Sequence, residues 1–364
     1  MKEDIMRLYG YDKYFETHAE MYAGQGLTPA RITEVHRDLF KAMAPEGETW
    51  CRLKGSAMYA MQTGDGYPAA GDFAMLNTTT GGEALIHAIL PRKSKFSRPK
   101  PGGHGDGERC DEQVIAANFD HVFITMSLNY NFNLRRLERY LTAAWQSGGT
   151  PCVILTKSDL RESDEQILAA QGLAAGVDVH AVSAVTGEGV DALNAYLQPG
   201  KTIVLLGSSG VGKSTLLNRL AGKDLMTTGD IRSDGAGRHT TTHRELFLLP
   251  CGTCIIDTPG MRELGMGDTS GLDDTFNEIA MLAERCRFAD CSHQQEPGCA
   301  VREALQNGTL DRKRYESYLK LQKEARFLRY KDEKRLREQS QIQISLQRRE
   351  LRKHYARKST LEYD

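Results

Sequence analysis

Residues 207–215 read GSSGVGKST, and this stretch decides the fold class. The apolar run TIVLL at 202–206 comes before it, and the amphipathic run LLNRL at 216–220, closed by Gly222, comes after it. A short apolar run is typical of a buried strand, and the later run has helical spacing. The sequence therefore predicts a strand, a glycine-rich loop and a helix in that order, which is the context of a P-loop.

The loop has the composition of a phosphate-binding site. Its glycines allow the backbone to curl so that successive N–H groups face inward, and the following helix adds the positive end of its dipole. We expect Lys213 to neutralise the β- and γ-phosphates of a nucleotide and the Ser214 hydroxyl to bind Mg²⁺. The predicted nucleotide-binding residues are Gly207, Ser208, Ser209, Gly210, Val211, Gly212, Lys213, Ser214 and Thr215.

The sequence TKSD follows the apolar strand pattern of residues 152–155 and resembles the guanine-recognition element [NT]KxD of GTPases. A carboxylate at Asp159 can accept from both the N1 proton and the exocyclic amine of guanine, whereas adenine offers no such donor pair on that edge. The stem of Lys157 can lie over the purine ring. We assign Thr156, Lys157, Ser158 and Asp159 to guanine binding.

Two further elements of a guanine nucleotide site occur at predicted strand ends. Ser183 and Ala184 open the sequence SAV, which resembles the SA[KL] element that supports guanine O6. Another strand pattern ends in DTPG, where Asp257 would hold Mg²⁺ through water and the Gly260 N–H would sense the γ-phosphate.

GRHTTT lies between the P-loop and DTPG, in the place of the switch threonine of the magnesium shell. We assign Thr241 to magnesium and leave Thr240 and Thr242 open as alternatives. Many GTPases carry a water-orienting Gln just after DxxG, but here the residue is Met261, which cannot orient water and predicts slow basal turnover. His239 is the nearest polar candidate for that catalytic role, and a packing role for it is equally open.

The order of these elements differs from that of ordinary GTPases, in which the P-loop precedes the guanine-recognition loop. Strands alternating with helices predict a doubly wound parallel α/β sheet, with ligands at the carboxyl ends of its strands. The elements need only be adjacent in space, so their order indicates a circularly permuted GTPase domain. Its switch would then lead directly into the C-terminal part of the chain.

Three cysteines and a histidine gather within fourteen residues: Cys286, Cys291, His293 and Cys299. Three thiolates and one imidazole form a complete tetrahedral zinc set with no open position, so we expect one structural Zn²⁺. Cys251 and Cys254 form C-x-x-C at an apparent hairpin with no second ligand pair nearby, and we interpret them as hairpin residues rather than metal or redox residues.

The charge is unevenly distributed. The chain has 47 basic and 48 acidic residues, a net charge of −1, but residues 311–364 hold 17 basic and 9 acidic residues, so this part carries +8 and the remainder −9. A basic tail is typical of contact with a phosphate-rich polymer, and a solvated helix is the alternative. No apolar run approaches the roughly 18 residues of a membrane span, and no signal peptide is recognisable, which predicts a soluble cytoplasmic protein.

The first hundred residues contain short β-type stretches separated by turn residues: 31–41, 48–59, 71–76 and 83–90. They predict a small β-barrel, for which the oligonucleotide-binding (OB) fold is the candidate of matching size and a purely structural barrel is equally consistent. The Gly- and Pro-rich residues 97–107 predict a flexible connection. We expect a multidomain chain with an N-terminal extension (1–30), an OB-fold barrel (31–108), the permuted GTPase domain (109–268), a zinc-binding helical domain (269–331) and a basic helical tail (332–364).

Together with the P-loop, TKSD and DTPG, the GRHTTT sequence and the cysteine run ending EPGCAV make the chain resemble the circularly permuted RsgA (YjeQ/EngC) family of small ribosomal subunit biogenesis GTPases. GDF, LPRKSKFSRP and AAN-x-D, all before residue 121, add to this resemblance. It implies GTP hydrolysis stimulated by the small ribosomal subunit during late maturation, with GTP or GDP, the subunit and its rRNA as partners. We also expect a monomer that binds no membrane.

One departure from the family pattern is Thr156, which replaces the more general Asn and removes an amide that usually braces the site. Two alternatives from other classes remain open: a P-loop ATPase or metabolite kinase, and a zinc-stabilised RNA-binding module with a vestigial nucleotide site. The base recognised through Asp159 distinguishes the first from a GTPase, and dependence on Lys213 distinguishes the second.

Overall fold

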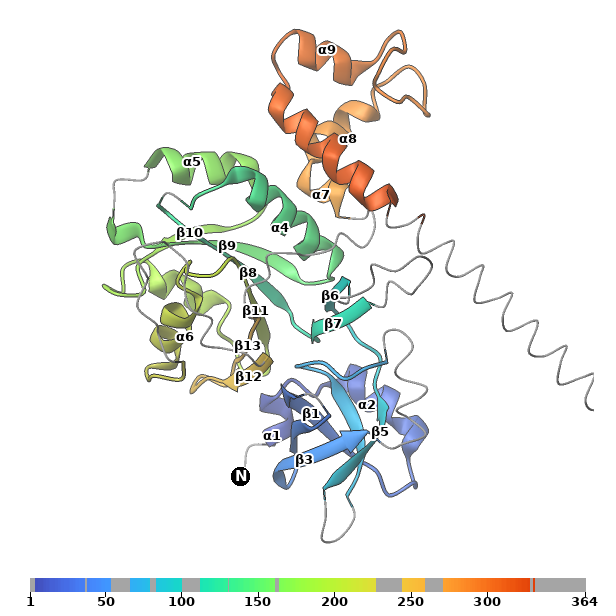
Figure 1. Ribbon diagram of the computed structural model, residues 1–364, viewed down its shortest axis with the longest axis vertical. Helices are drawn as coiled ribbons and strands as arrows, with labels where there is room; N and C mark the ends of the chain where they lie inside the picture. The colour runs from blue at the N-terminus through green and yellow to red at the C-terminus, as the bar shows by residue number, and fades with distance from the viewer. Residues whose placement is uncertain are drawn as a thin grey trace, which may run out of the picture.

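The computed structural model describes residues 4–36, 38–53, 66–78, 83–99, 112–129, 131–160, 164–226, 244–258, 271–327 and 330. Figure 1 shows three units: a small barrel with the N-terminal helices, an α/β sheet, and a helical unit beside the sheet. None of the helices within these ranges has the length and apolar character that a membrane span requires.

The barrel contains five strands: β1 (Thr28–Val35), β2 (Phe40–Ala44), β3 (Gly47–Leu53), β4 (Phe73–Asn77) and β5 (Ala84–Ile89). They pair in the order β1-β2-β3-β5-β4, and β4 returns to β1, so the sheet closes around a buried apolar interior. This is the OB-type barrel that the sequence predicts.

The strand limits within the barrel differ from the sequence prediction. The stretch 31–41 is divided between β1 and β2 by a turn in which the His36 N–H donates to the Leu39 carbonyl at 3.0 Å. Strand β1 also begins inside the predicted N-terminal extension. Its Thr28, Pro29 and Ala30 pair with β4, so the closure of the barrel draws these three residues into the sheet.

The N-terminal helices pack against the barrel. They are α1 (Ile5–Leu8), α2 (Lys13–Ala19) and the 3-10 helix η1 (Glu20–Tyr22). Phe15 of α2 is buried on Phe73 of β4, with 4.1 Å between ring centroids. These aromatic contacts give the aromatic-rich N-terminus a packing role that its sequence pattern does not specify.

A fully buried arginine joins three segments of the chain. The guanidinium of Arg31 donates to the carbonyls of Tyr9, of Gly71 at 3.3 Å and of Asn118 at 2.8 Å. Burial lowers the pKa of Arg31, because the cation is removed from water. The three carbonyls, which belong to the N-terminal segment, the barrel and the start of the α/β part, provide its hydrogen-bond acceptors.

A two-stranded ribbon connects the barrel to the α/β sheet. Strand β6 (Lys95–Pro99) pairs with β7 (Glu112–Ala117) in antiparallel fashion. The predicted flexible connection at 97–107 therefore begins as a strand, because pairing with β7 satisfies its backbone groups. Residues 100–111 lie outside the described residues.

The α/β sheet contains β8 (His121–Ser127), β9 (Thr150–Thr156), β10 (Val179–Val182), β11 (Thr202–Leu206), β12 (Arg244–Leu248) and β13 (Cys254–Asp257). Its order is β10-β9-β8-β11-β13-β12; the first five are parallel, and β12 is antiparallel to β13. Strand β12 also pairs with β1, which joins the sheet to the barrel.

Helices cover both faces of this sheet, as a doubly wound fold requires. They are α4 (Leu134–Gln146), α5 (Asp164–Leu173), α6 (Lys213–Ala221) and the 3-10 helices η2 (Ser158–Leu160) and η3 (Val190–Ala195). Buried residues of α4 and α5 belong to one apolar cluster, and those of α6 and η3 to a second. The next element after η3 is β11, whose end leads into the P-loop.

The helical unit follows the sheet. It contains α7 (Leu272–Thr275), α8 (Asn277–Ala283), α9 (Ala300–Gln306) and a helix over residues 312–327. Phe276, Ile279, Val301, Leu321 and Ala325 form its buried core. The predicted basic tail from residue 332 lies outside the described residues.

Candidate nucleotide site and metal centre

The predicted nucleotide-binding elements meet at one edge of the sheet. The parallel pairing places Val182 beside Thr156, Leu206 beside Ile124 and Leu205 beside Asp257. The loops that follow β9, β10, β11 and β13 therefore start at the same edge. Elements about fifty to a hundred residues apart in the chain are brought together by strand register.

The P-loop backbone adopts the conformation that its glycines permit. Gly210 and Gly212 have φ values of 77° and 99°, in the region that favours glycine. A Cβ atom on Gly207 would lie 2.5 Å from the Thr125 carbonyl oxygen, so this close approach to β8 also requires glycine. Helix α6 then begins at Lys213, directly after the loop.

Lys213 and Asp257 form the charged centre of the site. The Lys213 ammonium is buried and donates to the Gly207 carbonyl at 2.9 Å and the Ser208 carbonyl at 3.0 Å. Burial lowers the pKa of Lys213, and the nearby Asp257 opposes this shift. Burial raises the pKa of Asp257, and Lys213 opposes it. The two charges therefore stabilise each other in a buried position.

One oxygen of this centre has no partner among the described residues. Asp257 is 3% exposed at the end of β13, and its Oδ1 atom is buried without a hydrogen bond there. A buried carboxylate oxygen without a partner is costly unless a ligand or water satisfies it. Carboxylate and hydroxyl oxygens are the ligands that Mg²⁺ takes in such sites, so Asp257 and Ser214 fit the predicted ion.

The guanine-recognition loop contacts the P-loop directly. The Thr156 hydroxyl donates to the Val211 carbonyl, and Lys157 Nζ donates to the Gly210 carbonyl at 3.0 Å. Burial lowers the pKa of Lys157, opposed by Asp159. Thr156 therefore contacts the P-loop through its hydroxyl, at the position where the family pattern has an Asn amide.

The remaining guanine-binding candidates border the same edge. Asp159 is exposed on η2, and the buried Ser158 Oγ has no partner among the described residues. Ser183 is buried; its hydroxyl accepts from the Thr186 N–H at 3.1 Å, which shapes the turn carrying the half-buried Ala184. The structure therefore places these residues at the same edge of the sheet as the P-loop.

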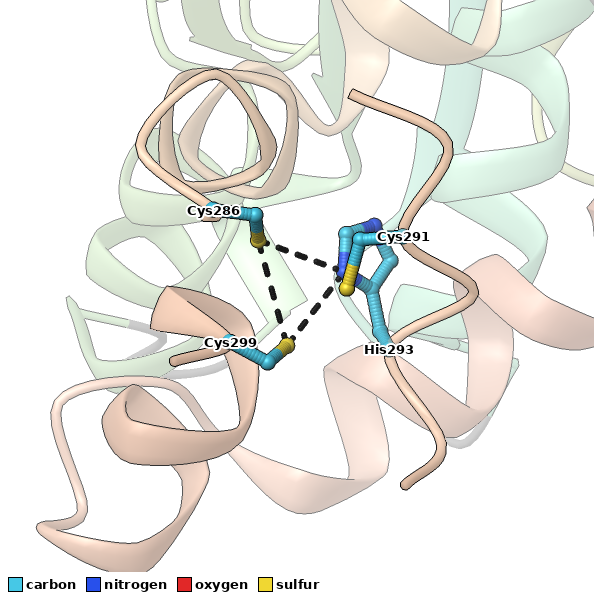
Figure 2. A group of neighbouring side chains, drawn as sticks. All are labelled: Cys286, Cys291, His293 and Cys299. Carbon is cyan, nitrogen blue, oxygen red and sulfur yellow. Dashed lines mark hydrogen bonds between the residues drawn. The ribbon is translucent and has the colours of Figure 1, made fainter. Parts of the chain in front are cut away.

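The Cys and His side chains converge in the helical unit (Figure 2). Their ligand atoms all lie within 4.8 Å of one another. Cys286 Sγ is 3.8 Å from Cys299 Sγ and 3.6 Å from His293 Nδ1, and Cys299 Sγ is 3.5 Å from His293 Nδ1. A tetrahedron with zinc–sulfur bonds of about 2.3 Å has edges of about 3.8 Å. The set of Cys286, Cys291, His293 and Cys299 therefore fits one zinc ion.

The C-x-x-C pair of Cys251 and Cys254 lies at the turn between β12 and β13. Cys251 is exposed, and its Sγ donates to Thr253 Oγ1 at 3.5 Å. Cys254 is buried in β13, with its Sγ 3.8 Å from the Leu8 carbonyl oxygen. Their side chains thus have contacts within the hairpin and with the N-terminal segment.

The chain is similar in sequence to one family of GTPases. A sequence profile of the RsgA GTPase family matches residues 89–267. The small ribosomal subunit biogenesis GTPase RsgA 1 of Listeria innocua is 44% identical over 353 residues, which cover 96% of this chain and 98% of that protein. The chain belongs to the RsgA GTPase family.

Further RsgA relatives and solved structures agree with the fold. The small ribosomal subunit biogenesis GTPase RsgA of Methanosarcina acetivorans is 39% identical over 351 residues, covering 94% of this chain and 92% of that protein. YjeQ from Thermotoga maritima matches with a TM-score of 0.60 and 25% identity, over 82% of this chain and 98% of that one. YloQ, described as a circularly permuted GTPase, matches with a TM-score of 0.57 and 23% identity, over 84% and 97%. The predicted fold class is confirmed.

Several predicted residues of this RsgA family member lie outside the described residues. They are His239, Thr240, Thr241, Thr242, Gly260 and Met261. Their proposed contacts with nucleotide, magnesium and water remain predictions.

Sequence reasoning missed residues that hold the P-loop in this RsgA protein. Thr125 Oγ1 donates to the Leu206 carbonyl at 2.9 Å, and Thr258 Oγ1 donates to the Leu205 carbonyl at 2.6 Å. Arg136 and Asn131 reach Ser208 from the start of α4. The only signal in the sequence is position: Thr125 and Thr258 are polar residues at the ends of apolar strands, and Arg136 lies in the first turn of a helix.

Proposed function

We propose that this chain hydrolyses GTP in the biogenesis of the small ribosomal subunit. One observation carries the proposal: the TKSD loop contacts the P-loop through Thr156 and Lys157, although TKSD precedes the P-loop by about fifty residues. A guanine-recognition loop fixed to a phosphate-binding loop is the arrangement that GTP requires. Membership of the RsgA family favours this function over a kinase, an ATPase or a vestigial nucleotide site.

In the proposed site, Asp159 accepts from guanine, Lys157 covers its ring, and Ser183 and Ala184 border O6. The P-loop N–H groups surround the phosphates, and Lys213 leaves its loop carbonyls to contact the β- and γ-oxygens. Magnesium, when bound with GTP, neutralises developing phosphate charge. Ser214, Thr241 and Asp257 would hold it. The assignment of Asp257 is supported by its buried Oδ1 atom, which has no hydrogen-bond partner among the described residues.

The attacking water needs a polar group near the γ-phosphate. Met261 cannot supply one, so we assign this role to His239 and the γ-phosphate contact to the Gly260 N–H. In solution without the small subunit, turnover is then slow. Docking of the subunit would order the catalytic groups and accelerate hydrolysis, after which the GDP-bound protein leaves.

The zinc ion has a structural role in this proposal. Four protein ligands occupy every tetrahedral position, so no position remains for substrate. The ligands lie between α8 and α9, and zinc would fix these helices around their small core. We place the chain in the cytoplasm as a monomer, with the barrel, the zinc-binding unit and the basic tail as contacts for the subunit and its rRNA.

The experiment measures GTP and ATP turnover by the full chain, with and without purified small ribosomal subunits. We expect GTP to be hydrolysed slowly, subunits to raise its kcat, and ATP to be unaffected. Equal use of ATP would favour the kinase or ATPase alternative. An absence of turnover under both conditions would favour a vestigial site.

A further inference from the structure

Helix α4 contacts the P-loop with its first turn. Arg136 Nη1 lies 2.9 Å from Asn131 Oδ1 and 3.2 Å from Ser208 Oγ, and Asn131 Nδ2 lies 3.4 Å from the same Ser208 oxygen. Asn133 caps the helix by accepting from the Arg136 N–H at 3.0 Å. The hydroxyl of the second P-loop residue is therefore held by a cationic side chain whose backbone is fixed by the cap.

The helical unit is attached to the next turns of the same helix. Glu138 of α4 is fully buried and accepts from Arg314 Nη1 at 3.2 Å and from the Ser317 hydroxyl. Arg314 also donates to the Thr275 carbonyl at 2.7 Å, and its guanidinium lies 4.6 Å from the centre of the Phe276 ring. Arg135 of the same helix also pairs with Glu138, with 2.7 Å between Nη1 and Oε1, so Arg314 is one of two cations that stabilise this buried carboxylate.

Two further contacts extend the attachment along α4. Arg139 forms a bidentate ion pair with Glu324 at 2.7 and 2.8 Å, and Thr142 Oγ1 lies 3.1 Å from Thr275 Oγ1. A Cβ atom on Gly271 would lie 2.4 Å from the Thr142 carbonyl oxygen, so the chain enters the helical unit in close contact with α4. Any displacement of the unit therefore acts on this helix.

We propose that α4 couples the helical unit to the P-loop, with Arg136 as a positioning residue that acts through Ser208. The residues that contact the P-loop and those that hold the helical unit are separated by only one turn of one helix. Leu137, Tyr140 and Leu141 bury the helix on the sheet, so it can transmit a shift as a rigid element. The role of this coupling rests on the proposed function. In a GTPase that docks on the small subunit, a partner that moves the helical unit would alter the phosphate site.

The first test needs neither nucleotide nor ribosome. Amide hydrogen exchange over residues 207–212 is measured in the full chain, in Arg136→Met, in Arg314→Met and in the double variant. We expect each single change to accelerate exchange by about threefold or more, and the double variant to exchange no faster than the faster single variant, because coupled residues are not additive. Unchanged P-loop exchange in Arg314→Met, or multiplied effects in the double variant, would overturn the proposal.

Charge-retaining and distant variants control this experiment. Arg136→Lys and Arg314→Lys should restore most of the protection, whereas a general packing role would not depend on charge. Arg52→Met removes an exposed ion pair with Glu83 in the barrel and should leave residues 207–212 unchanged. The zinc content of each variant shows whether the Cys and His cluster survives. If Arg314→Met loses zinc, Ser317→Ala, which removes one hydrogen bond to Glu138, must still accelerate P-loop exchange.

A second measurement separates this proposal from the proposed function. Arg314→Met should keep the basal kcat of GTP hydrolysis and lose most of the stimulation by small subunits, and Arg314→Lys should recover it. Full stimulation of Arg314→Met would contradict the coupling. If the unaltered chain hydrolyses no GTP, the proposed function fails, while the exchange experiment still decides whether α4 links the two units.

Discussion

The nucleotide site takes its side chains from strand ends spread between Thr125 and Asp257, whereas the Cys and His cluster takes all four ligands from residues 286–299. The first set is positioned by a buried parallel sheet with two apolar clusters. The second is positioned by short helices and loops with one small core. The phosphate loop therefore has its geometry from the sheet, whereas the Cys and His ligands are held only by these short helices, their loops and one small core.

Removal of zinc tests this contrast most severely. A structural zinc ion contributes on the order of 10 kcal/mol to the folding of a small unit. We expect Cys286→Ser, or treatment with a strong chelator, to remove zinc and helical structure from residues 271–327, while GDP binding persists. Circular dichroism, zinc analysis and GDP titration measure these effects. Cys251→Ser, at an exposed cysteine outside the cluster, is the matched control; loss of the whole fold on zinc removal would contradict the contrast.

Lys213→Ala tests the charged centre of the nucleotide site. Loss of a cation that contacts transferring phosphate is expected to lower the kcat for GTP by about 10²- to 10³-fold. Steady-state kinetics measure the effect, and zinc content should be unchanged. Lys201→Ala is the matched control, because it makes the same substitution at a lysine that pairs with Asp120 at the other end of β11. Retained turnover in Lys213→Ala would show that the P-loop is not the catalytic phosphate site.

Asp159→Asn tests recognition of the base. The carboxylate is expected to accept two charge-assisted hydrogen bonds, so its loss should weaken GTP binding by about 100-fold or more and favour xanthine nucleotides. Binding of GDP and XDP is compared in the variant and in Asp164→Asn, an exposed control on α5. An unaltered preference for guanine would remove Asp159 from the site.

Thr156→Val should give the smallest effect. It deletes the hydroxyl that donates to the Val211 carbonyl and leaves a buried acceptor without that partner. A net cost of about 1 kcal/mol corresponds to roughly fivefold weaker GDP binding. Thr156→Ser should retain the affinity, since it keeps the hydroxyl. Isothermal titration measures both, and equal affinity in Thr156→Val would show that this bond does not stabilise the loop.

Much of the fold could be predicted because its patterns are local. The glycine spacing from Gly207 to Gly212, the apolar runs and the clustered cysteines each specify an element within a few residues. The convergence of TKSD with the P-loop followed from a general property of parallel sheets. Family resemblance then supplied the OB-type barrel, whose strands alone were compatible with other small barrels.

Other features depend on packing between distant segments. The contact of Arg136 with Ser208 depends on the rotation of α4 over the sheet, which Leu137 and Leu141 determine jointly with residues of β8 and β9. The hydroxyl brace at Thr156 became visible only when the position of the Val211 carbonyl was known. Similarly, β6 extends into the Gly- and Pro-rich segment 97–107 because β7, which follows that segment, pairs with it.

Arg31 makes the folding of the N-terminal unit depend on residues that are translated later. Two of its three carbonyl acceptors, at Tyr9 and Gly71, are available once the barrel segment has been translated, but the third belongs to Asn118. Until that residue emerges from the ribosome, the Arg31 guanidinium lacks one of its three carbonyl acceptors. Completion of the N-terminal unit therefore waits for the first residues of its neighbour, and a truncated chain that stops before Asn118 should be degraded or aggregate more readily than one that extends past it.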